Sequence, residues 1–133
     1  MSAKKKVLIV TDGTESIDLI ALSLKNALTD FKVKICPADK FDGTDLLPAG
    51  IFFLGCEKPH PASFSYLEEM LSHINLAGRR CGIFSTNEKS IKYLRGIVKD
   101  CEANLGESLL VTDIAQKKVQ TKTVKKWLKG ILE

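Results

Sequence analysis

The sequence predicts a three-layer α/β fold in which helices cover both faces of a doubly wound, five-stranded parallel sheet. Short stretches rich in Val, Ile and Phe alternate about five times with longer stretches whose apolar residues recur at helical spacing. The chain has 133 residues, 44% of them hydrophobic and 27% charged, which is enough for one buried core. We therefore expect a single domain over residues 1–133.

The first half of the chain supplies three of the strands. Lys5–Val10 is a short apolar stretch that predicts a buried strand, and Ile17 to Leu28 has the apolar spacing of a helix that Ser16 would cap. Phe31–Cys36 alternates apolar and basic residues, as a strand near an edge of the sheet does. Asp42-Gly43 marks a turn, a short helix around Asp45 is weakly indicated, and the continuous apolar stretch Gly50–Cys56 predicts a central strand.

The second half continues the alternation. Phe64, Leu67, Leu71 and Ile74 form the apolar stripe of a helix, and Cys81–Phe84 predicts a fourth strand. Apolar residues then recur from Ile91 to Leu105, which predicts a helix that Gly106 ends. Leu109–Val111 would be the fifth strand. The last helix would bury Val124 to Leu132 and turn its lysines to solvent.

Composition and charge argue against several classes of protein. No apolar stretch approaches the ~20 residues of a membrane-spanning helix, and no signal-peptide pattern follows Met1, so we expect a cytoplasmic protein without a membrane partner. The net charge is +4, with six lysines gathered in residues 116–133. A basic tail of this kind is a solvated helix face rather than a nucleic-acid-binding surface, so no nucleic-acid partner is expected.

The four cysteines are Cys36, Cys56, Cys81 and Cys101, with no CxxC pair among them. Neither a zinc site nor a dithiol redox motif is therefore indicated, and we expect buried, reduced thiols. The two histidines have no neighbouring residues at metal-ligand spacing, so no metal is expected.

In a doubly wound sheet the ligand site lies outside the carboxyl ends of the strands, where the strand order reverses. The loops to consider therefore begin at Thr11, Pro37, Cys56, Ser85 and Thr112. Many of their charged residues are acidic, and this acidic rim would attract a basic partner protein. Its members are Asp12, Glu15, Asp39, Asp42, Asp45, Glu57, Glu88 and Asp113.

The first loop has the residue types of a phosphate site. Its residues are Thr11, Asp12, Gly13, Thr14, Glu15 and Ser16. Hydroxyls and backbone N–H groups at a helix N-terminus suit an anion, whereas the carboxylates of Asp12 and Glu15 would repel one. A polar turn with a helix cap explains the same residues, and both interpretations stay open.

Two further loops offer groups that suit a heterocycle. The loop from Cys56 ends in His60, which stands between two prolines and presents a planar ring. Ser85, Thr86 and Asn87 provide hydroxyl and amide groups, which serve equally well as a helix cap.

Residues 4–132 resemble the short-chain flavodoxins throughout. The resemblance is carried by Lys6 to Val10, by Ile51 to Cys56 with its Leu-Gly-Cys ending, by Leu76 to Phe84 with its Gly-Arg-Arg lead-in, and by Trp127-Leu128-Lys129. It implies the flavodoxin-like strand order 2-1-3-4-5.

Flavodoxins bind flavin mononucleotide (FMN) without a covalent bond and carry single electrons between proteins. The resemblance implies that Thr11, Gly13, Thr14 and Ser16 hold the phosphate, together with the other residues of the first loop. The isoalloxazine ring would be surrounded by Cys56, His60, Ser85, Thr86, Asn87 and Tyr93. A redox partner protein would dock on the acidic rim.

The chain departs from the family pattern at three points. The family loop reads Ser/Thr-x-Thr-Gly-x-Thr, and here the middle pair is transposed as Gly13-Thr14. The Trp usual in the second loop is absent, and the usual Tyr of the third loop aligns with Ile91, two residues before Tyr93. A flavodoxin-like domain that has lost FMN and binds another protein is therefore the main alternative.

Two other classes share the order of elements. A response-regulator receiver needs an Asp at the end of the third strand, where this chain has Cys56-Glu57. A class I amidotransferase-like hydrolase needs a nucleophilic Cys on a sharp turn, where this chain has Ser85-Thr86. No catalytic dyad is evident, so we expect an electron carrier or binding module rather than an enzyme.

Overall fold

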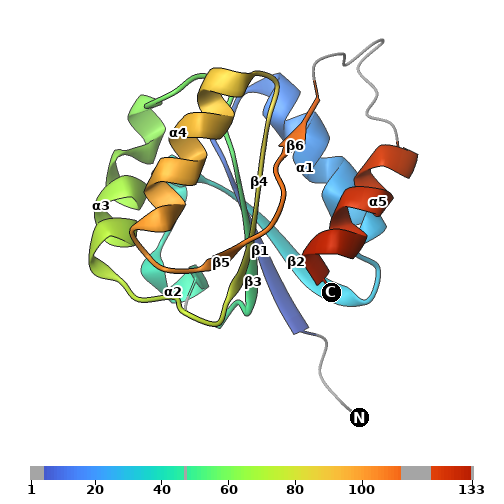
Figure 1. The fold of residues 1–133 in the computed structure, drawn as a ribbon, viewed down its shortest axis with the longest axis horizontal. Coiled ribbons are helices and arrows are strands. Elements are labelled where there is room, and N and C mark those ends of the chain that lie inside the picture. The colour runs from blue at the N-terminus through green and yellow to red at the C-terminus, as the bar shows by residue number, and fades with distance from the viewer. Residues whose placement is uncertain (1–4, 47, 112–120, 133) are drawn as a thin grey trace.

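The structure, a computed structural model, describes residues 5–46, 48–111 and 121–132. A central parallel sheet is covered by α3 and α4 on one face and by α1 and α5 on the other, which confirms the three-layer α/β prediction (Figure 1). The strands are β1 Lys5–Thr11, β2 Phe31–Pro37, β3 Ile51–Gly55, β4 Arg80–Ser85, β5 Asn104–Leu105 and β6 Leu109–Leu110. The helices are α1 Glu15–Ala27, α2 Gly43–Leu46, α3 Ser65–His73, α4 Glu88–Lys99 and α5 Thr121–Leu132, with 3₁₀ turns at Ala38–Lys40 (η1) and Ala62–Phe64 (η2).

The strands follow the order β2-β1-β3-β4-β5, as the flavodoxin-like prediction has it, and β6 also pairs with β4. The predicted fifth strand, Leu109–Val111, corresponds to β6, which pairs with the end of β4. The short strand β5, which pairs with the start of β4, lies in residues that the sequence assigned to the preceding helix. The edge position of β2 and the central position of β3 agree with the sequence patterns.

One helix prediction was too long. Helix α4 ends at Lys99, so Cys101 and Leu105 lie outside it and Gly106 does not terminate it. The chain reverses at Glu102, which has a φ of 62°, and Asn104 then donates its N–H to the carbonyl of Arg79 at 2.8 Å. Cys101 and Leu105 continue the apolar spacing of α4 in the sequence. They pack in the same core as α4 because the turn and β5 bring the chain back to it.

Two apolar clusters form the core, one on each face of the sheet. Leu8, Val10 and Phe52 pack beneath α3 and α4, whereas Ile9 and Phe53 face α1 and α5. All four cysteines are buried and free, as predicted. Within the part of the chain that the structure describes, no helix is long and apolar enough to cross a membrane.

Candidate functional site

The carboxyl ends of three adjacent strands lie side by side. Thr11 at the end of β1 pairs with Gly55 at the end of β3, and Gly55 pairs with Phe84 of β4. The loops 12–14, 56–61 and 86–87 therefore leave the sheet at the same edge. The strand order reverses here, since β2 and β3 flank β1, so this edge is where a doubly wound fold places a ligand.

Asp12 fastens the first loop to the second. Its Oδ1 accepts hydrogen bonds from the Thr14 N–H at 3.0 Å and from the Thr14 hydroxyl at 2.7 Å. Its Oδ2 accepts the N–H of Glu57 at 2.7 Å. Donors that a bound phosphate would use in this loop are thus held by a carboxylate of the chain itself.

Asn87 fastens the third loop to the second. Its side-chain N–H donates to the Glu57 carbonyl, which also accepts the Ser90 hydroxyl at 2.9 Å. Its Oδ1 accepts the Ser90 N–H at 2.9 Å and so caps α4. Ser85, fully buried, donates its hydroxyl to the Cys56 carbonyl at 2.6 Å. The polar groups of the third loop are predicted to suit either a heterocycle or a helix cap. In the structure Asn87 caps α4, and Asn87 and Ser85 both bond the third loop to the second.

Two hydroxyls of the first loop have no hydrogen-bond partner among the described residues. Thr11 Oγ1 and Ser16 Oγ are both buried and unpartnered. The predicted Ser16 cap is wrong: Thr14 is the N-cap residue of α1, and its side chain makes no capping hydrogen bond. Strand alternation directs the Thr11 side chain toward the face that α1 covers, and Ser16 lies in the first turn of α1. Orphaned hydroxyls at a helix N-terminus fit an anion such as a phosphate.

His60 and Tyr93 stand together at the second loop. Their ring centroids are 4.5 Å apart, His60 Nδ1 lies 3.5 Å from Glu68 Oε1, and the Tyr93 hydroxyl donates to the same oxygen. His60 has a φ of 52° and an exposed side chain, whereas Tyr93 is 8% exposed. Of these two rings, His60 is therefore the one exposed to a planar ligand, whereas the predicted ring neighbour Tyr93 supports His60 from the core.

Burial shapes the chemistry of the two ionisable groups beneath these loops. Burial, helped by the carboxylate of Asp12, raises the pKa of the Cys56 thiol to about 12. Burial and the hydrogen bond to Glu68 raise the pKa of Tyr93. Both shifts in pKa favour the protonated, uncharged form of the side chain at neutral pH.

One residue of the predicted acidic rim, Asp45, lies away from the ligand edge. Asp12, Glu57 and Glu88 stand at the ligand edge, with Glu15 in the first turn of α1. Asp45 lies against the middle of β2, where its Oδ1 is 2.7 Å from Lys34 Nζ, because α2 belongs to the connection that runs back from the carboxyl end of β2 to the amino end of β3. Thr112 and Asp113 lie outside the described residues.

The sequence patterns did not identify two residues of this site. Glu68 of α3 joins His60 to Tyr93, and Ser90 binds the Glu57 carbonyl. Neither has a clear signal in the sequence: Ser90 is a serine in the first turn of a helix, and Glu68 has the spacing of an ordinary surface position on α3. Among the described residues, no group of three His, Cys, Asp or Glu side chains is placed to hold a metal ion.

Comparisons with known proteins show the fold. No family model and no curated protein matches the chain. A solved short-chain flavodoxin associated with a non-canonical PDU bacterial microcompartment superposes with a TM-score of 0.80 at 14% identity, covering 98% of this chain and 97% of that one. A Fusobacterium nucleatum flavodoxin bound to flavin mononucleotide superposes with a TM-score of 0.74 at 14% identity, covering 98% of both chains.

The structural search also finds response regulators. The phosphorylated cyanobacterial phytochrome response regulator RcpA superposes with a TM-score of 0.54 at 17% identity, covering 95% of both chains. The higher scores of the flavodoxins agree with the flavodoxin-like prediction. The third strand here ends at Gly55 and is followed by Cys56-Glu57, so the phosphate-accepting Asp of a receiver has no counterpart.

Proposed function

We propose that this flavodoxin-like protein binds FMN at the carboxyl edge of its sheet and carries single electrons between proteins. The observation that carries the proposal is the pair of buried, unpartnered hydroxyls of Thr11 and Ser16 in the first loop. A buried hydroxyl without a partner costs stability, and a phosphate oxygen at the α1 N-terminus would satisfy both. The fold shared with a flavodoxin bound to FMN supports the same site.

Each loop has a part in this proposal. Thr11, Ser16 and the α1 N-terminus would hold the phosphate, with Gly13, at a φ of 82°, allowing the loop to turn. His60 would flank the ring, and the peptide groups near Cys56 and Thr86 would border its edge. FMN, when bound, supplies one-electron transfer. Glu57 and Glu88 place negative charge near the ring and so disfavour an added electron.

Asp12 tunes the phosphate affinity in this proposal. Its carboxylate holds both donors of Thr14, so a phosphate that uses them displaces it and meets its charge. Two unit charges ~4 Å apart interact by ~1 kcal/mol in water and more near a protein surface. Removing the charge should therefore strengthen FMN binding about tenfold.

The test is a titration with FMN and with riboflavin, which lacks the phosphate, followed by flavin fluorescence. We expect FMN to bind at least tenfold more tightly than riboflavin. Ser16→Ala should weaken FMN binding several-fold and leave riboflavin binding unchanged, and Asp12→Asn should strengthen FMN binding alone. Ser72→Ala is the matched control, because its hydroxyl, bonded to the Glu69 carbonyl at 2.6 Å, lies on α3. Equal affinity for both flavins would refute the phosphate site.

The Asp12 geometry also favours a second candidate, a flavodoxin-like domain without FMN that binds a protein. Asp12 and Asn87 join the three loops through Glu57, so the edge is closed by the chain's own groups. A basic partner would then dock on the acidic residues of the edge, with an affinity that falls as salt rises. If neither flavin binds the wild-type protein, this candidate stands and the electron-carrier proposal fails.

A further inference from the structure

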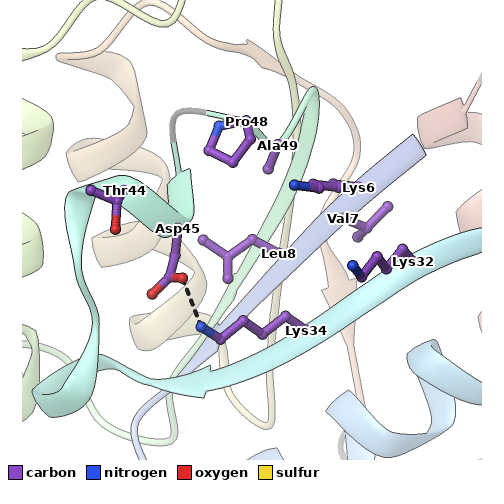
Figure 2. Close-up of a pocket in the computed structure, with 9 residues that line it drawn as sticks. All are labelled: Lys6, Val7, Leu8, Lys32, Lys34, Thr44, Asp45, Pro48 and Ala49. Carbon is purple, nitrogen blue, oxygen red and sulfur yellow. Dashed lines mark hydrogen bonds and ion pairs between the residues drawn. The ribbon is translucent and has the colours of Figure 1, made fainter. Parts of the chain in front are cut away.

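A cavity bordered by three lysines lies on the other half of the sheet. Lys6, Lys32 and Lys34 line a space of about 220 Å³ over the amino halves of β1 and β2, together with Thr44 and Pro48 (Figure 2). We refer to it as the lysine groove. Lys6 precedes Thr11 by five positions in a strand, which is roughly 16 Å. The lysine groove is therefore separate from the proposed FMN edge.

Strand register places the lysines on one face. Lys6 pairs with Lys32, and Leu8 pairs with Lys34. Side chains two residues apart share a face, so the three lysines lie on the side where Leu8 joins the core. Like charges directly opposite each other destabilise a sheet, which makes the Lys6–Lys32 pair costly on its own.

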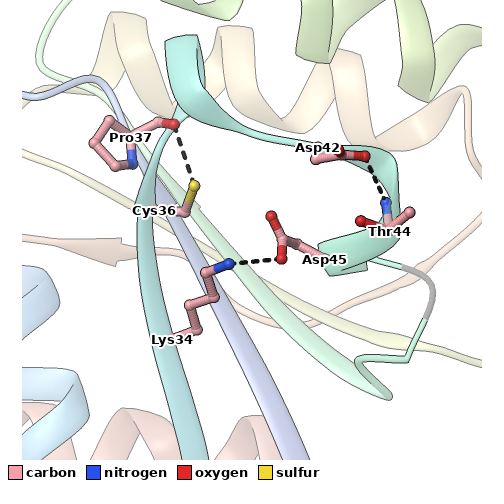
Figure 3. Close-up of polar contacts among 6 residues, drawn as sticks. All are labelled: Lys34, Cys36, Pro37, Asp42, Thr44 and Asp45. Atoms are coloured by element: carbon pink, nitrogen blue, oxygen red, sulfur yellow. Dashed lines mark hydrogen bonds and ion pairs between the residues drawn. The ribbon is translucent and has the colours of Figure 1, made fainter.

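Only one of these lysines is neutralised. Lys34 Nζ lies 2.7 Å from Asp45 Oδ1, and this hydrogen bond raises the pKa of Lys34. Asp42 accepts the Thr44 N–H at 3.0 Å and thereby starts α2, the helix that carries Asp45 (Figure 3). Lys6 and Lys32 have no acidic partner in residues 5–46, 48–111 and 121–132.

Protection of an exposed strand edge explains only part of this arrangement. Lysines on the outer strand β2 discourage pairing with other chains. Lys6, however, stands on β1, which has neighbours on both sides. Within its described residues, the connection from β2 to β3 carries the 3₁₀ turn η1 and the four-residue α2 in place of a long helix, which leaves room for the cavity over this part of the sheet.

We propose that the lysine groove binds a small phosphate monoester, with its phosphate between Lys6 and Lys32. Lysine acts as a point charge that suits phosphate, whereas planar carboxylates favour the fork of an arginine, which the groove lacks. Thr44 lines the same space and carries a hydroxyl, a group that donates to phosphate oxygens. Pockets for drug-sized ligands measure ~300–1,000 Å³, so this smaller space selects a compact ligand rather than a nucleotide.

The experiment is a titration of the full chain with n-butyl phosphate at constant ionic strength, followed by amide NMR shifts. We expect saturable shifts at Lys6, Lys32 and Thr44. Lys6→Met and Lys32→Met keep the apolar stem, and each should weaken the apparent affinity about fivefold. Lys92→Met, which removes an exposed lysine from α4, should leave the affinity within twofold.

Three results would overturn the proposal. The first is unchanged affinity in both Lys6→Met and Lys32→Met. The second is saturable shifts confined to the loop 11–16, which would place the anion at the proposed FMN site instead. The third is binding of a polyglutamate peptide without binding of butyl phosphate, which would make the groove a docking surface for an acidic protein. None of these results depends on whether FMN binds.

Discussion

Replacing Thr11 by Val should make the protein more stable. The Thr11 hydroxyl is buried and has no hydrogen-bond partner, and the residue is 1% exposed. Valine has nearly the same shape and leaves no polar atom without a partner. An unsatisfied buried polar group costs roughly 1–3 kcal/mol, so we expect the free energy of unfolding to rise by about 1–2 kcal/mol. For a chain of this length, each kcal/mol corresponds to roughly 3–5 °C in Tm.

The same loop provides a control of opposite sign. The Thr14 hydroxyl donates to Asp12 at 2.7 Å, so Thr14→Val should lower the free energy of unfolding by about 1 kcal/mol. Urea unfolding of both variants without flavin measures the two effects. If Thr11→Val proves destabilising by as much as Thr14→Val, the Thr11 hydroxyl has a partner in solution. The main support for the phosphate site would then be lost.

Three further predictions concern the elements that shape the ligand edge. Gly55→Ala would place a Cβ in collision with the Phe84 ring and should cost about 1–3 kcal/mol in urea unfolding, whereas the added Cβ of Gly50→Ala would meet no non-adjacent residue within 4 Å and should be nearly neutral. Asn87→Ala removes the α4 cap and a bond to the second loop, and should lower stability by about 1–2 kcal/mol. Because folding raises the pKa of Cys56 from 9.0 to about 12, the folded state binds its proton more tightly, so stability should fall as pH rises above about 9. This fall should be shallower in Cys56→Ala, and an identical pH profile would contradict the burial argument.

The sequence predicted the layers because these depend on local periodicity, whereas the strand order was implied by the resemblance to flavodoxins. The stretch of Gly50–Cys56 is apolar throughout, and the structure indeed buries β3 on both faces. Lys32 and Lys34 alternate with apolar residues, and β2 is an outer strand with that pattern. Such patterns involve only residues that are near one another in the chain, so they can be recognised from the sequence alone.

Contacts between residues far apart in the chain could not be predicted from the sequence. Asp12 and Glu57 are 45 residues apart, and nothing near Asp12 indicates that its carboxylate would bind that backbone N–H. From the sequence, the N–H and hydroxyl of Thr14 are therefore expected to be available to a phosphate, whereas in the structure both donate to Asp12. Similarly, Tyr93 has a polar hydroxyl that suits a ligand site, but Glu68 from another helix satisfies it in the core.

The most direct test of the account is an absorbance scan of the purified protein after excess FMN has been added and removed by desalting. The account predicts flavin bands near ~370 and ~450 nm that stay with the protein, and weaker retention in Ser16→Ala than in Ser72→Ala. A colourless protein that returns all the FMN would contradict the proposed electron carrier. It would leave a flavodoxin-like domain whose ligand edge is closed by Asp12.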